Sequence, residues 1–269
     1  MSGNQAHSAV DRATDSTAFE AAARAGHIVS GCLHLLIAYI IVRLAFGSGG
    51  NADQSGALAT LASATGGKIA LWVAAVAFVA MALWRLAEVI VGPHPGESGG
   101  EEKSWFGRGK ALSLMVVYLA FAFSAVQFAR GAGASSGQQN AGLSARMMTS
   151  TGGKALLIVV ALIVIAVGGY HVYKGVTRKF LDDLKVDGGG VVEPLGIVGY
   201  VAKGGVLAGA GVLLIVAVLK SDPSKATGID GAVKTLGEAP FGKFLLLLAA
   251  AGVAAYGLYS FVMARYARM

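Results

Sequence analysis

Eight ionisable or phenolic side chains lie in or at the ends of apolar stretches of this sequence, and their chemistry needs an explanation. Arg85 and Glu88 are three residues apart, and both follow a long run of apolar residues. Charged or imidazole groups in such stretches mark ion or proton pathways, substrate sites or buried pairs. We expect one polar cluster, on the cytoplasmic side, made of the following residues: His27, His34, Arg85, Glu88, His171, Lys174, Tyr200 and Lys203.

The spacing of Arg85 and Glu88 predicts an ion pair, because residues i and i+3 are neighbours on a helix surface. The alternative for the whole cluster is that its members reach water and lipid headgroups at the helix ends, as long polar side chains usually do. His34 fits that alternative poorly, because it lies seven residues after His27 and nearer the bilayer centre. A polar side chain at that depth normally faces protein or a cavity.

Two inward-facing histidines could ligate a haem iron, and His34 and His171 are the candidates. Their expected depths differ by roughly 10 Å, which disfavours a shared iron. The sequence holds no Cys-x-x-Cys-His motif, no acidic metal cluster and no nucleophile with an oriented base. We therefore expect no enzyme activity, no metal and no other cofactor.

A recurring motif divides the chain into three similar parts. Segments 65–68, 151–154 and 240–243 read TGGK, TGGK and PFGK, and about twenty apolar residues follow each of them. The lysines lie 86 and 89 residues apart, and an aromatic residue follows each lysine by sixteen positions. Such self-similarity indicates tandem copies of one supersecondary unit.

The recurring lysines invite comparison with a phosphate-binding loop, which needs Ser or Thr after the lysine and a strand before the motif. Neither is present, so that interpretation is excluded. We interpret Lys68, Lys154 and Lys243 as anchors that reach into lipid headgroups.

The composition is that of an integral membrane protein. Hydrophobic residues make up 55% of the chain and charged residues only 14%, with a mean hydropathy of +0.64. About 20 mainly apolar helical residues are needed to cross a hydrocarbon core of about 30 Å. We predict an all-α bundle of six membrane-spanning helices, built as three tandem hairpin repeats around a pseudo-threefold axis. The spans are expected at 27–46, 69–91, 111–129, 155–176, 199–219 and 244–264.

The boundaries follow from these spans and from the Gly-rich and charged segments between them. Both linkers between repeats are expected to be solvated, and the loop inside each repeat is expected to hold a short amphipathic helix. The predicted parts are a polar cytoplasmic tail (1–25), repeat 1 (26–92), a cytoplasmic linker (93–109), repeat 2 (110–180), a second cytoplasmic linker (181–197) and repeat 3 (198–269).

Six spans place both termini on one side of the membrane. Lys and Arg concentrate near the termini and in the two linkers, so we expect cytoplasmic termini in a bacterial plasma membrane. The net charge of +7 then suits anionic lipid headgroups rather than nucleic acid, for which no aromatic-basic module is present. The expected partners are the lipid bilayer and other membrane proteins. Gly205 and Gly209 form a GxxxG motif that is expected to let two helices approach closely.

The repeats resemble a known bacterial membrane family. Glycines lie near the start of the first span, at Gly26 and Gly31, and of the fifth, at Gly199 and Gly204. Segment 236–246 gives the clearest copy of the loop motif. These features are similar to those of the family called domain of unknown function 1206, over nearly all of the chain after the tail. The second repeat departs most, with Leu114 or Met115 in place of the glycine. The resemblance implies six membrane helices and no assigned activity, so it transfers no functional residue.

Three functions remain open. We favour a non-enzymatic multi-pass protein that packs against or stabilises a larger membrane complex, because small-residue helix faces are abundant and catalytic groups are lacking. A small-solute or ion transporter or channel that uses the polar cluster is the first alternative; internal repeats favour it, but no discontinuous helix is predicted. A haem-binding electron carrier is the second alternative.

Overall fold

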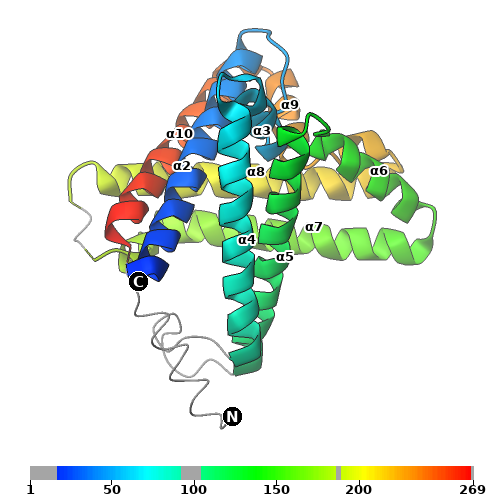
Figure 1. Cartoon of the computed structure of the whole chain (residues 1–269). Coiled ribbons are helices and arrows are strands. Elements are labelled where there is room, and N and C mark those ends of the chain that lie inside the picture. The colour runs from blue at the N-terminus through cyan, green and yellow to red at the C-terminus, as the bar shows by residue number, and fades with distance from the viewer. Residues whose placement is uncertain (1–16, 92–103, 186–188, 268–269) are drawn as a thin grey trace. The chain divides into compact units, whose positions relative to one another are not determined.

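The structure, a computed structural model, describes residues 17–91, 104–185 and 189–267. These residues form helices, and the described part of the chain contains no β-strand beyond an isolated bridge between Leu184 and Ala267. Six helices are long and apolar enough to cross a membrane. This confirms the predicted all-α fold with six spans. The spans, shown in Figure 1, are α2 (Thr17–Ala45), α4 (Gly67–Val91), α5 (Ser104–Ala129), α7 (Thr151–Val176), α8 (Val192–Lys220) and α10 (Gly242–Tyr266).

Shorter helices occupy the loop inside each repeat. They are α3 (Gln54–Ser63), α6 (Ser136–Met148) and α9 (Ile229–Glu238), with the 3-10 turn η2 (Pro223–Lys225) before α9. A further 3-10 turn, η1 (Lys179–Asp183), follows α7 between repeats 2 and 3. We call the span ends joined by α3, α6 and α9 the loop side, and the opposite ends the linker side.

The chain divides into two compact units, which are described separately. Unit 1 includes residues 61–133, and unit 2 includes residues 30–60 and 134–267. In unit 1, α4 and α5 run side by side (Figure 1). Phe78 of α4 stacks on Tyr118 at 6.4 Å between ring centroids and meets Phe121 edge-on at 5.5 Å. These contacts make an aromatic seam between the two helices.

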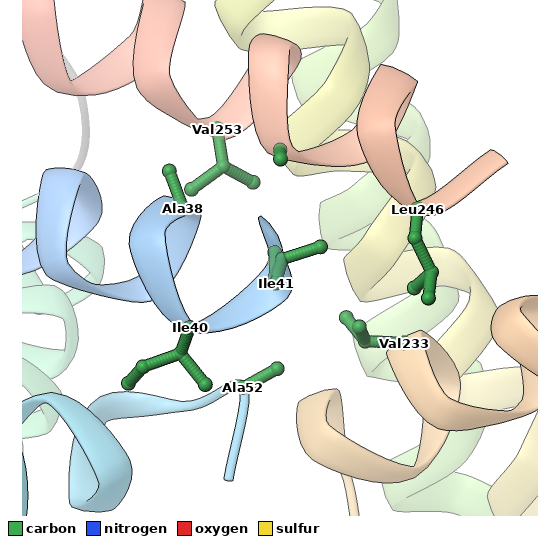
Figure 2. Packing of buried hydrophobic residues seen from close by; sticks show 8 residues of the cluster. Ala38, Ile40, Ile41, Ala52, Val233, Leu246 and Val253 are labelled. Atoms are coloured by element: carbon green, nitrogen blue, oxygen red, sulfur yellow. The ribbon is translucent and has the colours of Figure 1, made fainter. Parts of the chain in front are cut away.

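Unit 2 is organised around α10, which packs on α8 and on α2, while α7 packs along α8. Ile41 of α2 is fully buried in the core between α2, α9 and α10. Burial of such branched side chains removes apolar surface from lipid and water and gains dispersion contacts. Figure 2 shows the residues of this core: Ala38, Ile40, Ile41, Ala52, Val233, Leu246 and Val253.

Glycines set the closest helix crossings of unit 2. A Cβ atom at Gly204 of α8 would lie 2.5 Å from the carbonyl oxygen of Gly168 in α7. A Cβ atom at Gly257 of α10 would lie 3.1 Å from the carbonyl oxygen of Gly31 in α2. The predicted GxxxG contact is wrong, because a Cβ at Gly205 would have no neighbour within 4 Å and one at Gly209 would make only an ordinary 3.7 Å contact with Ala232.

The crossings follow one rule along the chain. The second span of each repeat packs on the first span of another repeat, as α4 does on α5, α7 on α8 and α10 on α2. A small buried residue lies fourteen positions after the recurring lysine each time, at Ala82, Gly168 and Gly257. Packing of this kind ties the repeats to one another and is consistent with the predicted repeat relationship.

Three expected polar segments differ from the prediction. Helix α2 already begins at Thr17, inside the expected N-terminal tail, and α5 begins at Ser104, inside the first linker. The remainder of that linker, 92–103, lies outside the described residues. The second linker is solvated only in part, because Leu184 is buried, as is Phe180 just before the linker, and α8 begins at Val192.

Candidate functional site

The structure assigns the predicted cluster residues to two groups. One group lies in unit 2 and the other in unit 1, and each is described by itself. The group in unit 2 consists of His34, His171, Lys174, Tyr200 and Lys203, and the group in unit 1 consists of His27, Arg85 and Glu88.

Tyr256 of α10 is the first centre of the group in unit 2. Its ring lies 4.7 Å from the ring of His34 and 5.4 Å from that of Tyr200, between centroids. The ammonium of Lys203 donates a hydrogen bond to the Tyr256 hydroxyl at 2.8 Å and lies 4.0 Å from the ring centroid. The contact is therefore both a hydrogen bond and a cation–π interaction, which holds a positive charge inside a spanning segment.

Tyr200 of α8 is the second centre, and it is 6% exposed. Its ring lies 5.9 Å from His171 and 5.6 Å from Tyr259, and the Lys174 ammonium is 5.5 Å from its centroid. Lys174 also forms an ion pair with Asp183 of η1 at 2.5 Å. We call the connected set the aromatic cluster; it comprises His34, His171, Lys174, Phe180, Tyr200, Lys203, Tyr256 and Tyr259.

Both histidines use one ring nitrogen within their own helix. Nδ1 of His34 lies 2.7 Å from the carbonyl oxygen of Ser30, and Nδ1 of His171 lies 2.8 Å from that of Val167. A carbonyl only accepts, so each Nδ1 carries a proton. The contact path between the two histidines runs through the rings of Tyr256 and Tyr200. That arrangement does not favour one iron held by both.

The turn η1 seats an aromatic ring against this cluster. Phe180 is fully buried, stacked on Tyr200 at 5.5 Å and edge-on to Tyr259 at 5.3 Å. The Tyr259 hydroxyl donates to the Phe180 carbonyl at 2.9 Å. The next residues pair with the end of α10, where the Lys185 amide donates to the carbonyl of Tyr266 at 2.7 Å. The segment following α7 is thus a packed cover on the linker side of unit 2.

In unit 1, Arg85 and Glu88 form the predicted ion pair at 2.7 Å. Only 13% of the Arg85 side chain and 7% of the Glu88 side chain are exposed. The indole nitrogen of Trp84 donates to the other Glu88 oxygen at 2.7 Å. The pairing is confirmed, and the carboxylate is held from two sides. His27 lies half-buried on α2.

Sequence reasoning missed four members or neighbours of the aromatic cluster. Tyr256 and Tyr259 are three residues apart near the end of a span, a spacing that places both on one helix face. Phe180 begins an apolar pair inside a charged segment, which signals a buried point in a linker. Asp183 is distinguished only by its partner Lys174, so the sequence carries no separate signal for it.

Two of the recurring lysines make contacts within the chain. Lys154 of α7 donates to the Ser221 hydroxyl at 3.1 Å, and Ser221 caps the C-terminal end of α8. Lys243 of α10 lies 4.3 Å over the ring of Phe46, the residue after α2. The carbonyl end of a helix carries partial negative charge, so a cation there is favourable. These contacts give Lys154 and Lys243 partners within the chain, and the headgroup-anchor interpretation stays a prediction.

Hydrogen bonds also connect the loops of different repeats. The Ala52 amide donates to the carboxylate of Asp230 in α9 at 2.7 Å, and Lys234 pairs with the same carboxylate at 2.7 Å. The Ser136 amide donates to the Ser55 hydroxyl at 3.0 Å. Asp230 is only 5% exposed, and its charge is compensated by these partners. The loop side is thus a connected cap.

Helical repeats and six apolar spans define a multi-pass membrane protein. The sequence profile of a family described as Domain of Unknown Function (DUF1206) matches residues 25–92, 111–178 and 198–267. The chain belongs to this family, which confirms the resemblance noted in its repeats.

A curated relative extends the comparison to a bacterium. The chain is 26% identical over 255 residues to the uncharacterized protein YxxB of Bacillus subtilis (strain 168), covering 91% of this chain and 90% of the relative. No solved structure matches the chain significantly. The comparisons therefore assign the family and indicate no activity.

Proposed function

We propose that this protein is a non-enzymatic accessory component that packs against a larger assembly in the membrane. The observation that carries the proposal is that α8 provides the main contact of α7 along its length, with only small contacts to α6 and η1 at its ends. Only 17% of the apolar stretch of α7 is buried within the described chain. The residues of this seam between α7 and α8 are Leu157, Ala161, Gly168 and Gly175, spaced four or seven apart on the face toward α8.

The rest of α7 is a broad apolar surface, which includes Ile163 at 57% exposed and Leu162 at 53%. Gly169 lies outside the seam, with no atom within 4 Å of the position of a Cβ. Helices in lipid associate through such small residues and close packing. A partner helix could therefore approach α7 closely on the face that α8 leaves uncovered.

The polar groups of unit 2 support the same proposal. Lys174 is paired with Asp183, and Tyr259 is bonded to the chain of η1. Both interactions join helices to one another, which is the behaviour of a structural network. A carrier instead needs polar groups that exchange a substrate between two states.

A transporter remains the second candidate because of Lys203. In the described part of the chain its hydrogen-bond partner is the phenol of Tyr256 rather than a carboxylate. An ammonium in a spanning helix that lacks an acidic partner favours an ion or proton site.

Site-specific photocrosslinking tests the leading proposal. A photoreactive residue at Ile163 should give one discrete adduct with another membrane protein in native membranes. The same residue at Leu157, which is 5% exposed and faces α8, is the matched control and should react within the chain. Lipid adducts alone at Ile163 would contradict the proposal.

Proteoliposomes separate the second candidate from the first. A pH-sensitive dye inside the vesicles should report no flux for the accessory protein. A proton or anion flux in wild type that disappears in Lys203→Met would contradict the accessory role and support a transporter.

A further inference from the structure

Aromatic side chains gather around one lysine on the loop side of unit 2. Phe46 is 64% exposed, Phe241 is 86% exposed and Phe244 is 62% exposed. Lys243 lies over the Phe46 ring at 4.3 Å. A shallow depression is lined by Phe241, Gly242, Lys243, Phe244 and Leu247. We call Phe46, Phe241, Lys243, Phe244 and Leu247 the loop-side patch.

Phe241 keeps an unfavourable backbone conformation within this patch. Its φ is +62°, in the left-handed region that a residue with a Cβ rarely adopts. The corresponding residue of repeat 1 is Gly66, whose φ is +76°, so a glycine meets the same requirement without strain. Packing within the chain does not compensate Phe241, since its side chain is almost fully exposed. A strained and uncovered aromatic residue indicates a role outside the chain.

Lys243 supplies the charge of the patch. Among the described residues its contact is the face of an aromatic ring and not a carboxylate. It is also exposed, in the first turn of α10, where the span begins. The positive charge is therefore available to an anion that approaches from the membrane interface.

We propose that the loop-side patch binds one anionic phospholipid of the facing leaflet. The phosphate lies on Lys243, and an acyl chain follows Phe244 and Leu247 toward the hydrocarbon. Charge and position select this occupant: the patch starts where a spanning helix begins, the depth at which aromatic and basic side chains meet headgroups. A phosphodiester carries the charge opposite to that of Lys243.

Native mass spectrometry of the whole chain, titrated with phosphatidylglycerol, tests the proposal. Lys243→Gln should weaken binding of the first lipid about tenfold, the loss expected for one charge-assisted contact. Lys68→Gln is the matched control, because Lys68 is the exposed equivalent in repeat 1 and has Gly66 in place of the phenylalanine. It should change the affinity by less than about twofold.

The variant Phe241→Gly separates a role in lipid binding from a role in folding, because affinity and melting temperature should change in opposite directions. This variant should bind the lipid several-fold more weakly and yet melt at a higher temperature, because the strain is removed. Diacylglycerol lacks the phosphate, so its affinity should be the same for wild type and for Lys243→Gln.

Other outcomes would overturn the proposal. Equal lipid affinity in wild type and Lys243→Gln would do so, as would an equal loss in Lys68→Gln. If inorganic phosphate alone bound to the wild-type chain, and Lys243→Gln weakened that binding as much as it weakened lipid binding, the patch would be a site for free anions. A wild-type dimer that dissociates in Phe241→Gly would assign the patch to an interface between copies of the chain.

Discussion

Gly168 and Gly204 face each other across the α7–α8 crossing, where a Cβ atom on either would lie 2.5 to 2.6 Å from the carbonyl oxygen of the other. The contact is reciprocal, so the two backbones approach as closely as hydrogen atoms on Cα allow. Lipid tails are as apolar as side chains, so this approach gains dispersion contacts that larger residues would prevent.

The first prediction compares two adjacent glycines. Gly204→Ala should lower the stability of the helix pair by about 1–3 kcal/mol, because backbone atoms of α7 must move away. Gly205→Ala is the control and should be neutral or slightly stabilising, since no atom lies within 4 Å of its Cβ position. Thermal melting in mild detergent measures both stability changes. Equal changes in the two variants would contradict the close crossing of α7 and α8.

The second prediction concerns Arg85 and Glu88. Removal of one partner leaves a buried charge, so Arg85→Met and Glu88→Gln should each cost about 3–5 kcal/mol. The double variant should recover part of that loss. If both side chains reached water independently, each change would cost under about 1 kcal/mol and the effects would add. A double-mutant cycle by thermal or denaturant unfolding distinguishes the two results.

The third prediction concerns the cover formed by η1. Phe180→Ala should cost about 3–5 kcal/mol, because a fully buried ring leaves a cavity between Tyr200 and Tyr259. Tyr259→Phe should cost about 1 kcal/mol through its hydrogen bond to Phe180. Phe123→Ala is the control on a 65% exposed ring, and its effect should be well below that of Phe180→Ala in the same melting assay.

The fourth prediction fixes the topology. Single cysteines at Gln138, in α6, and at Gly189, between repeats 2 and 3, should react from opposite sides of the membrane in a Cys32→Ser background. An impermeant maleimide applied to intact cells and to inverted vesicles measures this. We expect Gln138→Cys to react from outside. Labelling of both positions from one side would contradict the six-span arrangement.

Features that depend on a single helix were predictable from the sequence. The six spans followed from runs of apolar residues that match the thickness of a bilayer. The Arg85–Glu88 pair followed from helix geometry alone, since both partners lie on one helix. Neither inference required knowledge of which helices are neighbours.

Helix neighbours were not predictable for a physical reason. A span surrounded by lipid is apolar on all sides, so its sequence does not reveal which glycine faces another helix. The motif with Gly205 therefore looked as suitable as the contact made by Gly204. The partners of Tyr256 and Asp183 lie on other elements, and only the structure brings Lys203 and Lys174 to them.

The contact of Gly31 with Gly257 has a consequence for the order in which the chain matures. Helices enter the membrane as they are synthesised, N-terminal helices first. Helix α2 is the first described span and α10 the last, so a ribosome must complete repeat 3 before α2 meets its partner. Until then the face of α2 that carries Gly31 is not covered by α10. Premature termination before α10 would therefore leave the face of α2 that carries Gly31 without its partner helix.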